Sequence, residues 1–399
     1  MVVQKYGGTS LSTIESMRNV ARRITHTIRQ SGPIVIVVSA MGHTTDQLHS
    51  LAMKASSNPS AREMDMLLAT GEQVSSSLLT MMIRDQGLDA VALNGTQAGI
   101  QTEGAYSKNK IKAVDVQTIK DHLTNNRSVI VTGFQGVNST GDITTLGRGG
   151  SDTSAVALSA MLDVPCEIFT DVEGIYSIDP RRYTAAQKLP TITYEEMSEL
   201  ASLGANVLEA RAVELAQKYT VPLTVAHAHT HRSGTTIKEH STMLEQRTVT
   251  GVSVVDDIVL VSIENVSAPH QTIPKLFNAL SHRDINVDMI SHSYTSENGL
   301  NISFSSKTED FPALKDALED FRHHQPRITV HFDETLSKLS VVGIGMRTQS
   351  GVAAELFSLL GAQNIPFKLV TTSDISISYA IPKACANDAA VVIAEAFGL

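Results

Sequence analysis

The feature that most limits the fold of this chain is an internal repeat with an offset of 80 residues. Residues 270–293 (HQTIPKLFNALSHRDINVDMISHS) match residues 350–373 (SGVAAELFSLLGAQNIPFKLVTTS). A strand pattern precedes each copy and a second one follows it. The first copy continues through a helix around 310–323 and a further strand, so it predicts a complete βαββαβ module.

The second copy ends in its helix and lacks the last strand of the module. Residues 248–255 (TVTGVSVV) form a spare strand directly before the first copy. We expect this strand to complete the second module, which would insert the first module inside the second. Paired modules suit a sensor of small ligands, because strand and helix edges meet where the repeats adjoin; a purely structural duplication is the alternative.

The first ~230 residues have a different sequence pattern. Short apolar runs alternate there with amphipathic helical patterns, as is typical of α/β domains. The clearest buried strands are 34–38, 129–132, 167–170 and 222–225. A polar, unpatterned stretch then predicts a domain boundary near 230–248. A chain of 399 residues is in any case too long for one ordinary core.

Composition narrows the class of protein. Hydrophobic residues make up 42% and charged residues 18%, which indicates a folded globular protein. The net charge of −9 argues against a general nucleic-acid binder. The two cysteines, Cys166 and Cys385, lie far apart, and we see neither a secretory leader nor an apolar run approaching the ~20 residues that span a membrane. We therefore expect a cytoplasmic protein that binds neither membranes nor nucleic acid.

The richest candidate site is the stretch TTLGRGGSDTSAVALS (144–159), where three glycines surround Arg148 and a Ser-Asp-Thr-Ser run opens a helix. Glycines let backbone N–H groups approach a ligand, and a helix start presents unsatisfied donors. An arginine there can clamp a carboxylate or a phosphate. The alternative is a plain helix cap with a solvated arginine.

Other strand-to-loop turns follow the same pattern. They are Gly7-Gly8 after the first strand, Ser39 to Asp46, Glu72 after a Thr-Gly break, and the stretch 169–183. Ligands of open α/β sheets gather at the carboxyl ends of strands, although each turn alone could be structural. The cluster His227–His231 has no nearby acidic or cysteine partner, so we expect a solvated linker and no metal site.

Taken together in this order, the turns resemble the aspartate kinases of the amino acid kinase superfamily, over essentially the whole chain. The family's motifs occur here as KYGGTS (5–10), SAMGHTTD (39–46), TGE (70–72), GFQG (133–136), TTLGRGGSDT (144–153) and TDVEGIYSIDPR (170–181). The C-terminal repeat resembles the two ACT domains of that family, which read amino-acid levels and form the dimer.

The resemblance implies an α/β fold, with an open, mostly parallel sheet sandwiched by helices, followed by two α+β ACT domains, the first inserted in the second. We expect the catalytic domain at 1–240, a linker and completing strand at 241–256, the first ACT domain at 257–334 and the second at 335–399. The implied reaction transfers the γ-phosphoryl group of Mg·ATP to the side-chain carboxylate of L-aspartate, the first step of lysine, threonine and methionine biosynthesis.

The resemblance also implies a role for each motif residue. Lys5 would bridge the phosphates, and Asp152 would orient that lysine. Arg148 would take the substrate carboxylate and Glu72 its ammonium group. The remaining implied contacts are Ser39, Thr45 and Ser151 for the substrate, Gly7, Gly8 and Ser10 for the phosphates, and Thr170, Asp171, Tyr176 and Arg181 for the nucleotide. Mg²⁺ would be coordinated by the ATP phosphates and water, with no dedicated protein site.

The sequence departs from the family pattern at three places. The family's GAKVLHPR reads GANVLEAR (204–211), so a lysine usually near the nucleotide is Asn206. In the first ACT unit, His270 and His292 replace a usual glycine and glutamine where threonine binds in threonine-sensitive members. We therefore expect lysine as the effector, alone or together with threonine, at Asp288, His292, Ser293, Ser373 and Asp374.

Two further expectations concern assembly and the alternatives. We expect a homo-oligomer formed through the ACT domains; some relatives also make a short ACT-only subunit from an internal start, for which Met243 lies in the right linker. A kinase for another acidic amino acid is one alternative function. A non-catalytic amino-acid sensor with a decayed kinase domain is the other.

Overall fold

The computed structural model describes residues 1–205, 207–239, 247–267, 269–294, 300–325 and 327–399. Two compact units are present. The first comprises Met1–Ile175, Lys188–Ser202 and the described residues between 206 and 244, and the second comprises Tyr176–Gln187, Leu203–Ala205 and the described residues from 247 to the C-terminus. Each is described by itself.

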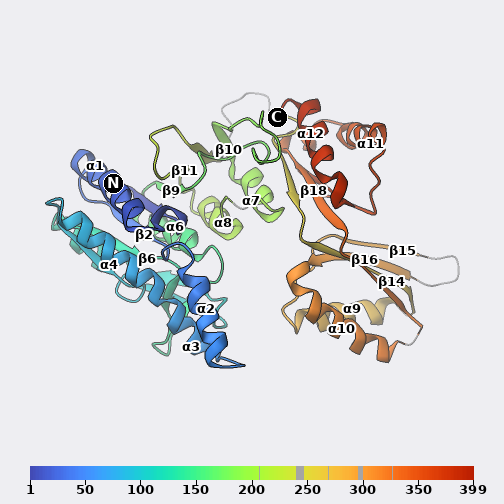
Figure 1. Ribbon diagram of the computed structural model, residues 1–399, viewed down its shortest axis with the longest axis horizontal. Helices are drawn as coiled ribbons and strands as arrows, with labels where there is room; N and C mark the ends of the chain where they lie inside the picture. The colour runs from blue at the N-terminus through green and yellow to red at the C-terminus, as the bar shows by residue number, and fades with distance from the viewer. Residues whose placement is uncertain (206, 240–246, 268, 295–299, 326) are drawn as a thin grey trace. The chain divides into compact units, whose positions relative to one another are not determined.

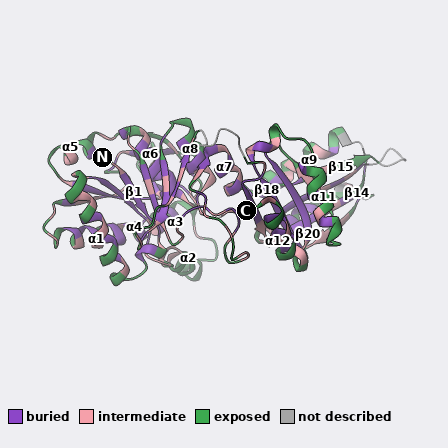
Figure 2. Cartoon of the chain, turned by 90° about the horizontal axis from the view of Figure 1, so that it is seen from above, coloured by how far each residue is buried: buried purple, intermediate pink, exposed green. Residues whose placement is uncertain are grey.

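An eight-stranded sheet is the centre of the first unit. Its strands are β1 (Val3–Tyr6), β2 (Val35–Val38), β3 (Ala90–Leu93), β6 (Ser128–Thr132), β9 (Cys166–Thr170), β10 (Thr191–Thr193), β11 (Leu223–His227) and β12 (Thr235–Lys238). They are ordered β10-β12-β11-β9-β1-β2-β6-β3, and all neighbours pair in parallel except β11 and β12. The four strands expected from apolar runs are β2, β6, β9 and β11. Strands β2 and β6 are buried along their whole length, as strands covered on both faces should be. Their neighbour β1 is likewise buried (Figure 2).

Helices cover both faces of this sheet, as the sequence predicted. On one face lie α1 (Ile14–Ser31) and α4 (Thr70–Arg84), side by side, and they share a core with Tyr6, Ile36 and Ile130 (Figure 1). Helix α6 (Gly150–Leu162) packs against β1, β2 and β9 with α8 (Ala210–Lys218) beside it. Since side chains alternate along a strand, Lys5 points away from the face that Tyr6 occupies.

The rest of the first unit builds the surroundings of the strand ends. It contains the short helix η1 (Thr9–Leu11), the helices α2 (Thr44–Ala55), α3 (Ala61–Leu68), α5 (Gln117–Thr124) and α7 (Tyr194–Ser202), and a small sheet of β4 (Ile100–Glu103), β5 (Lys110–Val114), β7 (Gln135–Val137) and β8 (Ile143–Thr145). The small sheet has the order β5-β4-β7-β8. Strand β8 leads directly into the glycine-rich turn before α6.

The second unit contains two four-stranded antiparallel sheets. The first module runs β14 (Ile258–Val266), α9 (Pro269–Ser281), β15 (Ile290–Tyr294), β16 (Leu300–Lys307), η2 (Thr308–Asp310), α10 (Phe311–His324) and β17 (Thr329–Asp333). The second runs β18 (Leu336–Val342), η3 (Ile344–Arg347), α11 (Val352–Ala362), β19 (Leu369–Thr372), β20 (Ser376–Pro382), η4 (Lys383–Cys385) and α12 (Ala386–Phe397).

The second module takes its fourth strand from before the first module. Strand β13 (Gly251–Val255) pairs antiparallel with β18, in a sheet of order β13-β18-β20-β19. The first module has the corresponding order β15-β16-β14-β17. The predicted insertion of one ACT-type module inside the other is therefore confirmed.

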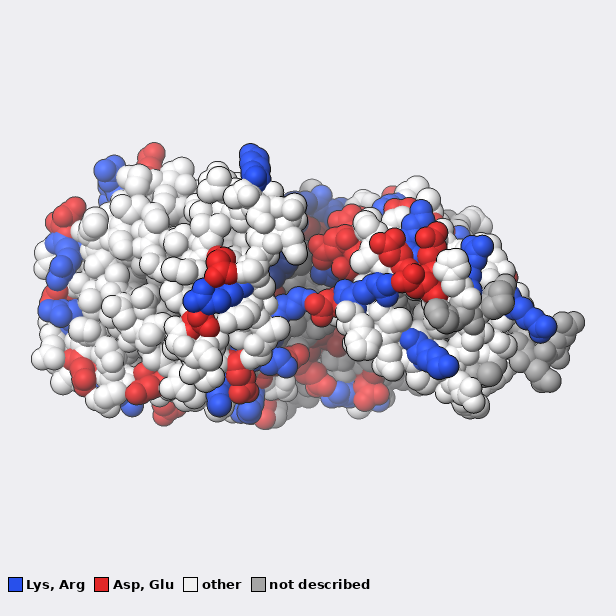
Figure 3. Space-filling model, turned by 90° about the horizontal axis from the view of Figure 1, so that it is seen from below, with Lys and Arg blue, Asp and Glu red and all other residues white. Residues whose placement is uncertain are grey.

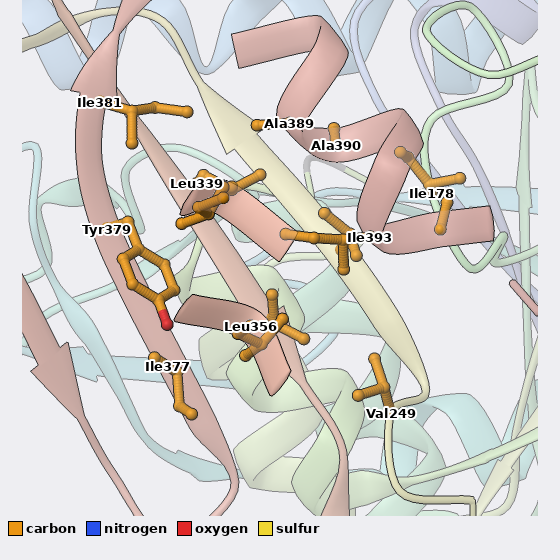
Figure 4. Packing of buried hydrophobic residues seen from close by; sticks show 14 of the residues in the cluster. Ile178, Val249, Leu339, Leu356, Ile377, Tyr379, Ile381, Ala389, Ala390 and Ile393 are labelled. Carbon is orange, nitrogen blue, oxygen red and sulfur yellow. The ribbon is translucent and has the colours of Figure 1, made fainter. Parts of the chain in front are cut away.

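A segment from the middle of the chain completes the core of the second module. Ile178 lies in that core with Leu339, Tyr379 and Ile393, and the exposed fraction of its side chain is 2% (Figure 4). The backbone N–H of Val252 donates to the carbonyl of Ser177 at 2.7 Å. The segment Tyr176–Gln187 thus groups with the second unit although it precedes residue 240, where we placed the end of the catalytic domain.

The face of the chain drawn in Figure 3 carries side chains of both charges. On the face shown in Figure 3, acidic and basic side chains lie interspersed with uncharged ones. Within the ranges described above, no helix is long and apolar enough to cross a membrane. Asn206 and Met243, which carried two of the expectations, lie outside the described residues.

Candidate active site

A buried ion pair joins the first strand to the start of α6. The ammonium nitrogen of Lys5 lies 2.6 Å from Asp152 Oδ1, and the two side chains are 10% and 9% exposed. Apart from this ionic contact, Asp152 Oδ1 has no hydrogen-bond partner within the described ranges. A buried charge pair with spare bonding capacity is weak as a stabilising device, which favours a chemical role.

Of the two glycines after β1, Gly7 lies beside this pair and Gly8 packs closely against the turn after β2. A Cβ atom at Gly7 would lie 3.6 Å from the Lys5 ammonium, and one at Gly8 would lie 2.8 Å from the carbonyl oxygen of Ala40. The Gly8 carbonyl accepts a hydrogen bond from Gly42 N at 2.9 Å, which holds this turn against the turn after β2. In η1, the hydroxyl of Ser10 is buried and finds no partner in the part of the chain that is described.

Two serines connect the end of β2 to the first turn of α6. The hydroxyls of Ser39 and Ser151 lie 2.9 Å apart, and Ser75 of α4 donates to the Ser39 carbonyl at 2.7 Å. A Cβ atom at Gly133 would lie 2.7 Å from Ser151 Cβ, so only glycine fits after β6. The carboxyl ends of β1, β2 and β6 therefore meet the N-terminus of α6, where backbone donors favour an anion.

Glu72, in the first turn of α4, is a buried carboxylate with one oxygen in use. Ala40 N donates to its Oε1 at 3.0 Å, while Oε2 is buried and has no hydrogen-bond partner among the described residues. Burial raises the pKa of Glu72 to about 7, although the Ala40 N–H opposes the shift. A cation placed at Oε2 would supply both the missing partner and the missing charge.

Arg148 and Thr45 lie on the turns that flank this cluster. Arg148 is exposed between Gly147 and Gly149, whose φ angles of 77° and 66° are left-handed. Thr45 is half-buried at the start of α2. The turn from β8 into α6 therefore places Arg148 at the surface, on a backbone that favours glycine.

The expected nucleotide residues divide between the two units. At the end of β9, which is the neighbour of β1, Thr170 Oγ1 donates to Asp171 Oδ1 at 3.1 Å. Tyr176 is half-buried in the second unit, where exposed Arg181 pairs with Asp179 at 2.7 Å. The guanidinium of Arg181 holds the pKa of Asp179 below its usual value.

The expected effector residues lie in the two modules of the second unit. Asp288 is half-exposed and pairs with the ammonium of Lys338, which is itself 5% exposed. His292 and Ser293 are exposed on β15, an edge strand, with the His292 ring edge-on to Tyr294. In the other module Ser373 Oγ lies 2.8 Å from Ser376 Oγ, and Asp374 is exposed beside it. The first three of these residues belong to one module and the last two to the other, and the edge strands β15 and β19 of the two modules are in contact.

The histidine cluster forms no metal centre in the described structure. His227 ends β11, and its Nδ1 accepts a hydrogen bond from His229 N at 3.0 Å. No group of three or more His, Cys, Asp or Glu side chains within the described ranges is placed to hold a metal ion.

Two acidic residues that lie near the site were not identified from the sequence. Asp65 of α3 is fully buried behind the Arg148 turn, and the signal was present as one acid within the apolar run EMDMLL. Glu209, before α8, lies against the same turn, since a Cβ atom at Gly149 would meet Glu209 Oε2 at 2.5 Å. Glu209 belongs to the segment GANVLEAR, which departs from the family motif. The sequence showed that departure, but it did not show that Glu209 lies beside the Arg148 turn.

Comparison with known proteins places this arrangement in a family. The amino acid kinase family matches residues 1–227, and an ACT domain matches residues 339–397. An aspartokinase from Geobacillus stearothermophilus is 44% identical over 400 residues, covering 100% of this chain and 97% of the relative. Aspartokinase 2 from Bacillus subtilis is 45% identical over 379 residues, covering 95% and 93%.

A solved structure shares the fold of the whole chain. Aspartokinase III from E. coli, in complex with aspartate and ADP, has a TM-score of 0.82 over 99% of both chains at 21% sequence identity. The family matches and the identity to these two enzymes over nearly the full chain lead to one conclusion: the chain belongs to the aspartokinases, the ATP-dependent kinases of aspartate.

Proposed function

We propose that the cluster around Lys5 and Asp152 is the place where this aspartokinase transfers the γ-phosphoryl group of Mg·ATP to the side-chain carboxylate of L-aspartate, giving 4-phospho-L-aspartate. The observation that carries the proposal is the buried Lys5–Asp152 pair beside Gly7, next to a buried carboxylate with a free oxygen. A carboxylate nucleophile is already ionised at neutral pH, so the reaction needs no general base. It needs positive charge and positioning, because two anions must meet.

Each part of the cluster has a matching task in this reaction. Lys5 neutralises the transferring phosphoryl group, and Asp152 keeps the ammonium pointed at it. Arg148 binds the α-carboxylate of aspartate, and Glu72 binds its ammonium group. The other contacts we propose are Ser39, Thr45 and Ser151 for the substrate, Gly7, Gly8 and Ser10 for the phosphates, and Thr170, Asp171, Tyr176 and Arg181 for the nucleotide.

Mg²⁺ fits this arrangement as a companion of the nucleotide. The described side chains form no cluster of metal ligands, and Mg²⁺ commonly keeps several waters and binds substrate phosphates. The ion would spread the charge of the phosphates, while Lys5 and the N-terminus of α6 act from the protein side.

We also propose that lysine, alone or together with threonine, inhibits the enzyme through the second unit. The support is that Asp288 already holds a lysine ammonium, that of Lys338. We propose further that the chain forms a homo-oligomer through its ACT modules, with or without a shorter ACT-only subunit.

A hydroxylamine assay tests the activity at its site. With aspartate, ATP and Mg²⁺, hydroxylamine should trap the acyl phosphate as the hydroxamate, and the Lys5→Ala protein should form it at least about a hundredfold more slowly. Product formation by Lys5→Ala at the wild-type rate would exclude the proposed site. Preference for glutamate in a substrate panel would indicate a kinase for another acidic amino acid. Lysine binding without any phosphoryl transfer would indicate a non-catalytic sensor.

A further inference from the structure

Asp65 holds two distant segments with its two carboxylate oxygens. Its Oδ2 accepts from Ser107 N and from Thr145 N, both at 2.9 Å. Its Oδ1 accepts from Ser107 Oγ at 3.0 Å and from Thr145 Oγ1 at 2.7 Å. The side chain is fully buried, so these four hydrogen bonds replace its hydration.

The segments that Asp65 joins are those that present Arg148 and Glu72. Thr145 is the last residue of β8, three positions before Arg148. The carbonyl oxygen of Ser107 lies 3.0 Å from where a Cβ atom at Gly147 would be, so the Ser107 loop touches the Arg148 turn. On the other side, α3 is separated only by Ala69 from α4, whose first turn carries Glu72.

The Ser107 loop depends on this carboxylate for its conformation. Ser107 has a φ of 67°, which is left-handed and unfavourable for a residue with a side chain. Both its N–H and its hydroxyl donate to Asp65, which offsets that strain. A loop held in this way stays in place against Gly147 when the site is empty.

We propose that Asp65 is a positioning residue for the amino-acid substrate: it fixes the Arg148 turn relative to Glu72, and so sets the span between the groups that bind the carboxylate and the ammonium of aspartate. This inference rests on the proposed roles of Arg148 and Glu72. Preorganisation of that span lowers the KM for aspartate, because binding need not order the turn.

The Asp65→Asn variant tests the inference with little change in size. An amide offers one acceptor oxygen, and its NH₂ group faces donors, so two of the four hydrogen bonds are lost. The KM for aspartate should rise by about tenfold or more, while kcat falls less and the KM for ATP stays within about twofold. Glu196→Gln is the matched control, since Glu196 is also buried in the first unit and accepts from Thr193 N and Oγ1. It should lower the melting temperature without changing the KM for aspartate.

Two milder variants keep the test open if Asp65→Asn does not fold. Ser107→Gly tolerates the left-handed backbone and removes one hydrogen bond, and Thr145→Val removes another while keeping the backbone donor. Each should raise the KM for aspartate severalfold, and the double variant should raise it further.

The outcomes separate this inference from the proposed function. Hydroxamate formation by the wild type together with its loss in Lys5→Ala tests the proposed function, independently of Asp65. If that result holds and the variants lower kcat with the KM for aspartate unchanged, or raise both KM values equally, Asp65 has a structural role and the inference is overturned.

Discussion

Glu72, which we propose binds the ammonium group of the substrate, is a buried carboxylate with a raised pKa. Its buried Oε2 lacks a partner within the described chain, and burial raises its pKa to about 7. The ionised form is the one that attracts an ammonium group, and it predominates only above that pH. The proposed role of Glu72 therefore links substrate binding to pH at a value where ordinary glutamates do not titrate.

The pH dependence of the KM for aspartate follows from this link. As the pH falls from 8 to 6, Glu72 takes up a proton and loses its attraction for the substrate ammonium. The KM for aspartate should rise, approaching about tenfold per pH unit below pH 7, while kcat changes little. Initial rates at saturating ATP measure this. A KM that is independent of pH over this range would contradict the assignment of Glu72.

The same shift predicts an effect on stability. The pKa of Glu72 is higher in the folded chain than in the unfolded one, so the folded state loses stability as the pH rises from about 4.5 to about 7. Glu72→Gln removes this ionisation. It should melt a few degrees higher than the wild type at pH 8 and at nearly the same temperature at pH 5, as measured by calorimetry without ligands. Equal melting temperatures at pH 8 would show that Glu72 is not destabilised by burial.

Among the elements, the turn between β1 and η1 has little room for a larger residue at Gly8. Gly8 has an ordinary helical φ of −60°, so its requirement for glycine comes from contact and not from backbone strain. Gly8→Ala would place a methyl group 2.8 Å from the Ala40 carbonyl, and the turn beside Lys5 must move. We expect kcat/KM to fall by about tenfold or more with the circular dichroism spectrum unchanged.

A glycine without close neighbours serves as the control. Gly361, near the end of α11, has nothing within 4 Å of an added Cβ atom. Gly361→Ala should leave activity unchanged and raise stability by up to about 1 kcal/mol. Wild-type kinetics in Gly8→Ala would show that the turn can adapt and that the phosphates do not depend on it.

The sequence predicted the elements whose signal is local. Strands β2 and β6 are continuous apolar runs, and α1 keeps one apolar face with Thr13 accepting from Ser16 N at its start. Strands β7 and β8, at three residues each, carry no periodicity and are defined by their pairing. At the site, the glycine turns were visible in the sequence. The role of Asp65 was not, because its partners lie 42 and 80 residues away.

At the scale of the whole molecule, the inhibition by lysine that we propose centres on one ion pair between the two ACT modules. Lys338 of β18 places its buried ammonium on Asp288 of the first module. A free lysine that binds Asp288 must displace an ammonium of the chain itself. The affinity for the effector is therefore set by a competition within the second unit.

Two variants test separately the two residues of this ion pair, Asp288 and Lys338. Asp288→Ala removes the acceptor, and the lysine concentration for half-inhibition should rise by about tenfold or more. Lys338→Met keeps the buried stem and removes the competing charge, so half-inhibition should occur at a lower lysine concentration than in the wild type. Titrations with lysine and threonine, singly and together, measure both. Equal inhibition of wild type and Asp288→Ala would exclude the assigned effector site.

Because β13 pairs with β18, the sheet of the second module can close only after the first module has been synthesised. Strand β13 ends at Val255, and its partner begins at Leu336, after the entire first module. At about 5–20 residues per second, this strand waits on the ribosome for several seconds with its edge unpaired while the first module folds. Any shorter product from an internal start must begin upstream of Gly251 if its last sheet is to close, because a later start would leave β18 exposed to pairing with a neighbouring chain.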